Sequence, residues 1–189
     1  MPPWPESIQR VALLGGESTG KTTLARALAE TLHTLWVPEY GRQRWEELRE
    51  TLSVSELVQV GLTQVAWELE HAQQAAQRGA HWLLCDTTPL TTLQYCLHDH
   101  GQAPAELLVL AQRRYDLTVL CEPDFAFVQD GCRRDDGFRN EQHAWTLARL
   151  VEMGVQPLVV QGSVETRVQQ VLGALQTLQR RPAADEVSA

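Results

Sequence analysis

The chain has 189 residues, of which 43% are hydrophobic and 21% are charged, and its net charge is −8 at neutral pH. This length and composition are typical of one folded domain, and the acidic balance argues against a general nucleic-acid binder, which needs a basic surface. We expect residues 1–179 to form a single domain and residues 180–189 to form a flexible tail.

Signals for secretion or membrane insertion are not found in the sequence. The N-terminal residues do not combine a basic segment with an apolar one, and no apolar run approaches ~18 residues. The four cysteines lack the C-x-x-C spacing of a metal or redox site. We therefore expect a cytoplasmic protein with reduced thiols and no membrane partner. Nothing in the sequence indicates an oligomeric state.

Residues 15–22 read Gly-Gly-Glu-Ser-Thr-Gly-Lys-Thr and match G-x-x-x-x-G-K-[ST], the pattern of a phosphate-binding P-loop. An apolar run at 8–14 predicts a strand before the loop, and leucines at 24, 28 and 32 predict a helix after it. The N–H groups of such a loop point at an anion, aided by the helix dipole. The alternative is a chance glycine-rich turn. We expect ATP to contact Gly16, Glu17, Ser18, Thr19, Gly20, Lys21, Thr22 and Thr23.

Lys21 is the only lysine in the chain, because every other basic residue is arginine. A compact ammonium on a flexible stem suits a tightly wrapped phosphate better than a planar guanidinium does. We expect Lys21 to reach the β- and γ-phosphates and the Thr22 hydroxyl to bind Mg²⁺.

The rest of the chain alternates between predicted strands and helices. Strands are expected at 35–37, 81–86, 117–121 and 156–160. Helices are expected at 44–50, from the capping box at 53–56 to Gly79, from about 89 to Gly101, and at 105–112, 139–153 and 163–179. In the longest helix the expected inward stripe is Val58, Leu62, Val65, Leu69, Ala72 and Ala76. This order predicts an α/β fold, a five-stranded parallel sheet with helices on both faces.

Carboxylates follow several of these strands, at the edge where parallel sheets bind ligands. Asp86 ends an apolar strand, as a Walker B carboxylate does, and is expected to serve the metal or the nucleophile. The alternative is an N-cap for the next helix. Glu39 follows the second strand and could accept a hydroxyl proton or bind a ribose hydroxyl. Its alternative is a solvated helix start.

Arginines gather in the polar connection after the fourth strand. Arg133, Arg134 and Arg139 stand among glycines and aspartates, so residues 124–139 are expected to form a lid loop. The arginines could clamp phosphate oxygens, with Arg134 and Arg139 on ATP and Arg133 acting during transfer. The alternative is a solvated loop with internal Arg–Asp pairs. Tyr40, Phe125 and Phe127 could each stack on an aromatic ring or pack in the core.

The motifs together resemble the ribosylnicotinamide kinase domain of NadR-type proteins. The matching stretches are Gly-Glu-Ser-Thr-Gly-Lys-Thr-Thr at 16–23, Glu39-Tyr40-Gly41-Arg42, Asp86-Thr87, Pro89-Leu90-Thr91-Thr92, and Pro123-Asp124 with Asp130-Gly131-x-Arg133. The resemblance implies a P-loop kinase that uses ATP and Mg²⁺ to phosphorylate the 5′-hydroxyl of nicotinamide riboside, giving nicotinamide mononucleotide. It implies that Lys21 binds phosphate, that Glu39 and Tyr40 face the nucleoside and that Arg133 belongs to the lid.

From these motifs we expect two sets of residues around the reaction. The catalytic set is Lys21, Glu39, Asp86 and Arg133. The nucleoside-binding set is Glu39, Tyr40, Arg42, Asp86, Asp124, Phe127 and Asp130, and the metal set is Thr22 and Asp86.

The sequence departs from the NadR pattern at two points. Full-length members carry an adenylyltransferase domain, and some a DNA-binding domain, before the kinase. Because the first strand is expected near residue 8, we expect neither domain here. Phe127 stands where a tryptophan is expected, which leaves the base preference open. The alternatives are a kinase for another nucleoside or nucleotide, and a nucleotide-binding regulatory ATPase.

Overall fold

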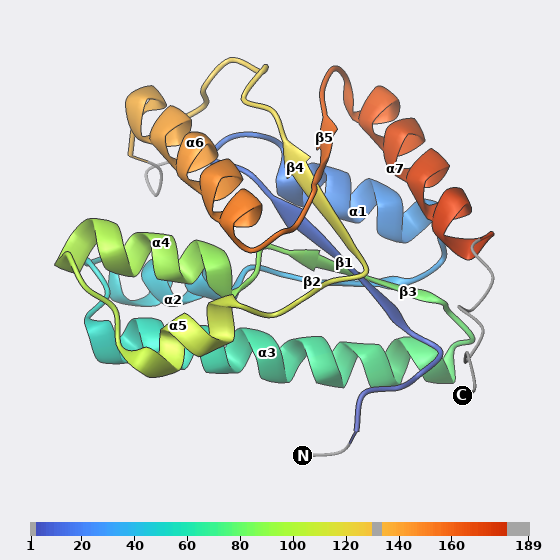
Figure 1. The fold of residues 1–189 in the computed structure, drawn as a ribbon, viewed down its shortest axis with the longest axis horizontal. Coiled ribbons are helices and arrows are strands. Elements are labelled where there is room, and N and C mark those ends of the chain that lie inside the picture. Colours follow the sequence, from blue (N-terminus) through green and yellow to red (C-terminus); the bar gives the residue numbers. More distant parts are fainter. Residues whose placement is uncertain (1–2, 130–133, 181–189) are drawn as a thin grey trace, which may run out of the picture.

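The computed structural model describes residues 3–129 and 134–180. Its five strands form one parallel sheet in the order β2-β3-β1-β4-β5 (Figure 1). The strands are β1 (Gln9–Leu14), β2 (Leu35–Val37), β3 (Trp82–Asp86), β4 (Leu117–Cys121) and β5 (Leu158–Val160). The helices within these ranges are α1 (Lys21–Thr31), α2 (Tyr40–Leu48), α3 (Val54–Gln77), α4 (Pro89–His100), α5 (Ala105–Ala111), α6 (Asp136–Glu152) and α7 (Val164–Gln179). The predicted five-stranded parallel α/β sheet is confirmed.

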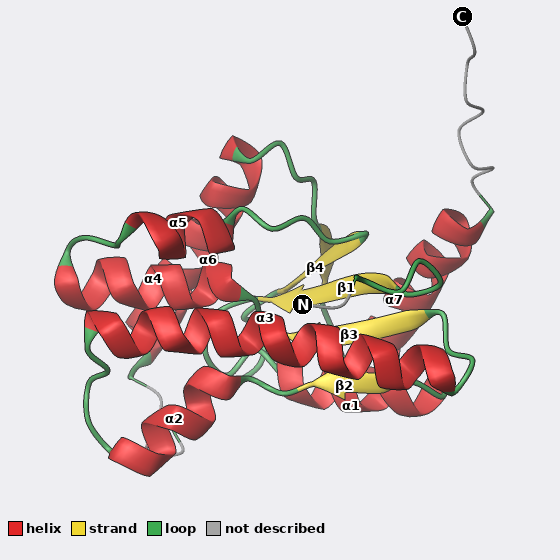
Figure 2. Cartoon of the chain, turned by 90° about the horizontal axis from the view of Figure 1, so that it is seen from below, coloured by secondary structure: helices red, strands yellow, loops and turns green. Residues whose placement is uncertain are grey.

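Helices cover both faces of the sheet (Figures 1 and 2). On one face, Val11 and Leu13 of β1 pack in a cluster with leucines and valines of α1 and α7. On the other face, Leu14 and Leu120 pack in a cluster with residues of α3, α4, α5 and α6. Successive side chains of a strand point to opposite faces, so β1 contributes to both clusters. Both faces of the central strands are therefore buried, which explains their continuous apolar runs.

The strand registers bring the predicted site residues to one edge of the sheet. Asp86 of β3 pairs with Leu13 of β1, and Cys85 pairs with Val37 of β2. The loops after β1, β2 and β3 therefore leave the sheet side by side. This is the carboxyl edge, where a ligand was expected.

Two helices begin earlier than the sequence predicted. Helix α2 starts at Tyr40, four residues before the expected start, with Glu39 as its N-cap residue. Helix α6 starts at Asp136, where the Asp135 side chain accepts a hydrogen bond from the Phe138 N–H at 2.7 Å. Arg139 therefore lies inside a helix, and the predicted lid loop is shorter at that end.

The capping box of α3 is confirmed, because Ser53 and Glu56 accept hydrogen bonds from each other's backbone. The predicted inward stripe of α3 is partly wrong. Leu62 is exposed, whereas the polar residues Gln64 and Glu68 are almost completely buried. Each of these polar side chains has a hydrogen-bond partner far away in the sequence, which periodicity does not reveal. Gln64 binds the backbone beside Glu39, and Glu68 accepts a hydrogen bond from the Tyr115 hydroxyl at 2.8 Å.

In the described ranges, the helices are all too short or too polar to cross a bilayer.

Candidate active site

The P-loop joins β1 to α1 and places the uncapped N-terminus of α1 at the cavity. Gly20 is the N-cap residue of α1, with a φ of 80°, and no side chain caps the helix there. This left-handed conformation favours glycine because a side chain would strain it. The first N–H groups of a helix have no partner within the helix. An anion bound in the loop would satisfy them and would also meet the positive end of the dipole.

Buried contacts hold the loop from behind. The Thr19 hydroxyl, fully buried, donates to the Gly16 carbonyl at 2.8 Å, which closes the loop on itself. Arg167 of α7, 1% exposed, donates to the Thr19 carbonyl at 2.7 Å and to the Glu122 carbonyl at 3.0 Å. Its charge is paired with Asp124. The loop is therefore held in one shape before any ligand arrives, which reduces the entropy cost of binding.

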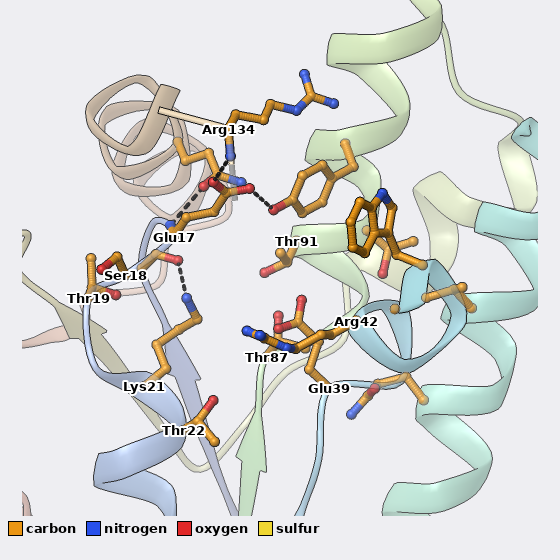
Figure 3. Close-up of a pocket in the computed structure, with 18 of the residues that line it drawn as sticks. Glu17, Ser18, Thr19, Lys21, Thr22, Glu39, Arg42, Thr87, Thr91 and Arg134 are labelled. Atoms are coloured by element: carbon orange, nitrogen blue, oxygen red, sulfur yellow. Dashed lines mark hydrogen bonds between the residues drawn. The ribbon is translucent and has the colours of Figure 1, made fainter. Parts of the chain in front are cut away.

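Lys21 lies across the loop (Figure 3). Its Nζ donates to the carbonyls of Gly15 and Gly16, at 3.0 and 2.7 Å. The ammonium is half-buried at the cavity wall. A phosphate bound in the loop could replace the two carbonyls as its hydrogen-bond acceptor. Hydrogen bonds to a charged acceptor are stronger than those to carbonyls.

Thr22 and Asp86 form the pair expected for Mg²⁺. The Thr22 hydroxyl donates to Asp86 Oδ2 at 2.6 Å. Asp86 is 1% exposed, and its Oδ1 has no hydrogen-bond partner among the described residues. Burial raises the pKa of Asp86, while the Thr22 hydrogen bond and the Lys21 charge lower it. A buried carboxylate oxygen without a partner, beside a P-loop hydroxyl, fits a site for Mg²⁺ or its bound water.

Asp86 is not the cap of the next helix, which was its structural alternative. Thr88 is the N-cap of α4, and its hydroxyl accepts from the Leu90 N–H at 3.2 Å. Pro89 occupies the first turn, as the sequence predicted. The Asp86 carboxylate therefore contacts Thr22 of the P-loop and does not cap α4.

A cavity of about 570 Å³ opens in front of the P-loop. Its walls come from the loop, from α2 and α3, and from α4, with Arg134 and Gln142 on a further side. The lining includes the predicted site residues Glu17, Ser18, Thr19, Gly20, Lys21, Thr22, Thr23, Glu39, Arg42 and Arg134. This volume suits a small-molecule ligand.

Glu39 faces this cavity from the start of α2 (Figure 3). It is half-buried, and its side chain makes no capping hydrogen bond to its own helix. Desolvation raises the pKa of Glu39 from 4.5 to about 7, against the opposing charge of Lys21. A carboxylate with a pKa near neutral can accept a proton and later release it.

Glu17 connects the P-loop to two other walls of the cavity (Figure 3). Its carboxylate accepts from the Tyr95 hydroxyl at 2.8 Å and from the Arg134 backbone N–H at 2.7 Å. Its own N–H donates to the Gln142 side chain at 2.9 Å. The residue that the sequence assigned to ATP therefore also fixes the loop relative to α4 and α6.

The described arginines of the expected lid both pair with aspartates. The Arg134 side chain points away from Lys21 (Figure 3) and forms an ion pair with Asp99. Arg139 is buried in α6, donates to the Phe125 carbonyl at 2.8 Å and pairs with Asp136. Arg139, expected where the lid meets the helix, therefore lies in the first turn of α6. Arg133 and Asp130 lie outside the described residues.

Four predicted nucleoside-binding residues do not line the cavity in the described part of the chain, namely Tyr40, Asp86, Asp124 and Phe127. Asp86 is buried and is hydrogen-bonded to Thr22, which does line it. Asp124 pairs with Arg167 and accepts from the Gly162 N–H at 2.5 Å. The Phe127 ring lies under the Arg139 guanidinium, 5.6 Å from its centroid. The Tyr40 ring packs edge-on against Trp67 at 5.0 Å between centroids, as a core residue does.

Several cavity residues were missed from the sequence. Trp45 lines the cavity from α2, whose early start was not predicted. Thr91, Tyr95 and Asp99 also line it, from one face of α4. These three residues are spaced four positions apart in the helix that follows Asp86. This spacing places them on one helical face, and it could have identified this wall of the cavity from the sequence.

Sequence comparison agrees with this geometry. A family model described as an AAA domain matches residues 10–167. The trifunctional NAD biosynthesis/regulator protein NadR of Salmonella typhimurium is 30% identical over 137 residues. That match covers 68% of this chain and 32% of NadR, so the chain spans about a third of the relative's length.

Solved structures share the fold. NadR in complex with NAD and AMP-PNP superposes with a TM-score of 0.70 at 19% identity, covering 96% of this chain and 52% of that one. NadR in complex with NR gives 0.67 at 22% identity, covering 96% and 54%. Thymidylate kinase from Ehrlichia chaffeensis gives 0.65 at 15% identity, covering 89% and 99%. The P-loop kinase fold and the resemblance to NadR are thereby confirmed, and the chain belongs to the AAA domain family.

Proposed function

We propose that this protein is an ATP-dependent kinase that phosphorylates the 5′-hydroxyl of nicotinamide riboside to give nicotinamide mononucleotide. The observation that carries the proposal is Glu39, a carboxylate with a pKa of about 7 on the cavity that the P-loop lysine also lines. A phosphate donor on one side and a proton acceptor on the other are the two requirements of hydroxyl phosphorylation.

ATP would bind at the P-loop. Its N–H groups and Lys21 would hold the β- and γ-phosphates, and the Thr22–Asp86 pair would hold the metal or its water shell. When bound, Mg²⁺ would neutralise phosphate charge and so favour transfer. Arg133 remains our sequence-based choice for the lid arginine.

The nucleoside acceptor would bind against the cavity walls that face the P-loop. Trp45 and Tyr95 contribute aromatic rings to the cavity, and both rings already lie within 6 Å of an arginine guanidinium carbon, at 5.4 Å from Arg49 and 5.8 Å from Arg134. Aromatic faces attract cations through the ring quadrupole. The nicotinamide ring of the riboside is cationic and planar, so it could stack on either ring in place of the arginine.

The chemical step then needs no covalent enzyme intermediate. The acceptor 5′-oxygen forms a bond to the γ-phosphorus, the bond from that phosphorus to the ADP oxygen breaks, and Glu39 takes the hydroxyl proton. Lys21 would balance charge on the phosphoryl oxygens as the bond breaks.

The comparisons support the same substrate. The relative in Salmonella typhimurium is named for NAD biosynthesis, and NadR structures hold AMP-PNP with NAD in one case and NR in another. An ATP analogue and a nicotinamide riboside bound to proteins of this fold are the pair of substrates that we propose.

A panel of nucleosides incubated with ATP and Mg²⁺ tests the proposal. ADP should form with nicotinamide riboside well above the rate with ATP alone. Conversion of a different nucleoside in its place would keep the kinase chemistry and refute the substrate. ADP formation that no nucleoside or nucleotide accelerates would favour a regulatory ATPase.

A further inference from the structure

Thr87, directly after Asp86, has an unusual backbone. Its φ is 77°, in the left-handed region that favours glycine. The other described non-glycine residues with positive φ are Ser18, His33 and Arg49, so Thr87 is the β-branched member of this group. A branched side chain is poorly accommodated there, because Cβ substituents crowd the backbone.

The side chain of Thr87 is also unsatisfied. It is 3% exposed, and its Oγ1 has no hydrogen-bond partner among the described residues. Its backbone N–H is satisfied, since it donates to the Leu13 carbonyl at 3.1 Å. A buried hydroxyl without a partner destabilises a fold and calls for an explanation.

The turn explains the backbone but not the residue type. Asp86 ends β3 and binds Thr22, while Thr88 must stay extended to cap α4 and to precede Pro89. The chain therefore has to change direction at residue 87. Glycine would make this turn without strain. A threonine whose hydroxyl has no partner among the described residues indicates that the hydroxyl serves a ligand.

The position of Thr87 identifies the kind of partner. Thr87 lines the cavity beside Glu39 (Figure 3) and is adjacent in sequence to the proposed metal residue. Thr87 therefore shares one cavity with Lys21 and Thr22 of the P-loop and with Glu39, the groups between which a phosphoryl group would be transferred. Phosphoryl oxygens are acceptors, and the hydroxyl has a proton to donate.

We propose that Thr87 is a further substrate-contacting residue, whose hydroxyl donates a hydrogen bond to the transferred phosphoryl group. This rests on the proposed kinase function. The contact exists only when the phosphoryl group is present, so it strengthens binding of the transition state and of the mononucleotide product. It leaves binding of the unphosphorylated nucleoside unchanged.

The test compares Thr87→Val, which keeps the shape and branching, with Thr87→Ser, which keeps the hydroxyl. Thr118→Val, a similarly buried threonine in β4, is the matched control. Thr87→Val should lower kcat about 10- to 100-fold and weaken mononucleotide affinity by a similar factor, as for a lost hydrogen bond to a charged group. Nucleoside affinity should stay at the wild-type value, and Tm should not fall, because the hydroxyl that is removed has no partner among the described residues. Thr87→Ser should restore kcat, and Thr118→Val should behave as wild type.

Two results would overturn the inference while the kinase function stands. One is a Thr87→Val protein with wild-type kcat and mononucleotide affinity. The other is a variant in which nucleoside affinity, mononucleotide affinity and Tm fall together, which indicates a structural role. If the wild-type protein phosphorylates no acceptor, the proposed function fails first, and this inference fails with it.

Discussion

The buried amide of Gln64 holds the backbone on both sides of Glu39. Its Oε1 accepts from the Tyr40 N–H at 3.0 Å, and its Nε2 donates to the Pro38 carbonyl at 3.2 Å. Gln64 is 1% exposed, so water does not compete for these bonds. The position of the proposed proton acceptor is therefore set from helix α3.

Gln64→Met tests this link by keeping the side-chain length and removing both hydrogen bonds. We expect kcat for nucleoside phosphorylation to fall up to about 100-fold, because small displacements of a catalytic group are costly. ATP affinity should persist. Glu68→Gln, one turn further along α3, is the matched control and should affect stability more than kcat. Equal loss of kcat in both variants would contradict the positioning role.

Activity should depend on pH through Glu39. Below its pKa of about 7 the carboxyl group is protonated and cannot accept the hydroxyl proton. The kcat/KM for the nucleoside should therefore fall about tenfold per pH unit below that value and level off above it. Glu39→Gln should remove this fall of kcat/KM at low pH together with most of the activity. A profile that stays flat between pH 5 and 8 would contradict the assignment.

The same pKa predicts an effect on stability. The pKa of Glu39 is raised from 4.5 to about 7, so the folded state binds this proton more tightly than the unfolded chain does. Ionisation therefore costs stability as pH rises between those two values, and the loss persists above them. Glu39→Gln should raise Tm at pH 8, with a smaller gain near pH 5. A lower Tm at pH 8 would contradict this account.

The sequence predicted the parts of the site that depend on local pattern. The P-loop, the strand ends and Asp86 follow from short motifs and from the rule that ligands bind at the carboxyl edge of a parallel sheet. Gln64 could not be assigned in this way, because its role depends on backbone 24 residues away in the chain. Gln64 lies beside the polar Glu68 on the buried face of α3, off the apolar stripe that the sequence predicted. Arg139 was expected where the lid meets the helix, but it lies in the first turn of α6 because that helix starts three residues earlier, at Asp136.

Asp86→Asn should separate metal binding from folding. The amide keeps the shape of the carboxylate but removes the charge that would attract Mg²⁺. We expect the Mg²⁺ concentration for half-maximal activity to rise about 10- to 100-fold. Because burial raises the pKa of Asp86, removing its charge should not lower Tm. An unchanged Mg²⁺ dependence would contradict the assignment.

Lys21 can be tested by chemistry as well as by substitution. It carries the only side-chain amine of the chain, so an amine-directed reagent has one side-chain target besides the N-terminus. ATP should protect this amine, and Lys21→Ala should abolish turnover while the protein stays folded. Labelling of Lys21 at the same rate with and without ATP would contradict the P-loop assignment.

The central claim is that the phosphoryl group of ATP is transferred to the 5′-hydroxyl of nicotinamide riboside with the help of Glu39. The most direct measurement is to incubate the wild-type and Glu39→Gln proteins with both substrates and Mg²⁺ and to determine where the product carries phosphate. The account predicts nicotinamide mononucleotide phosphorylated at the 5′-oxygen from the wild type, and almost none from Glu39→Gln. It is contradicted if the wild type forms no mononucleotide, or if Glu39→Gln forms it at the wild-type rate.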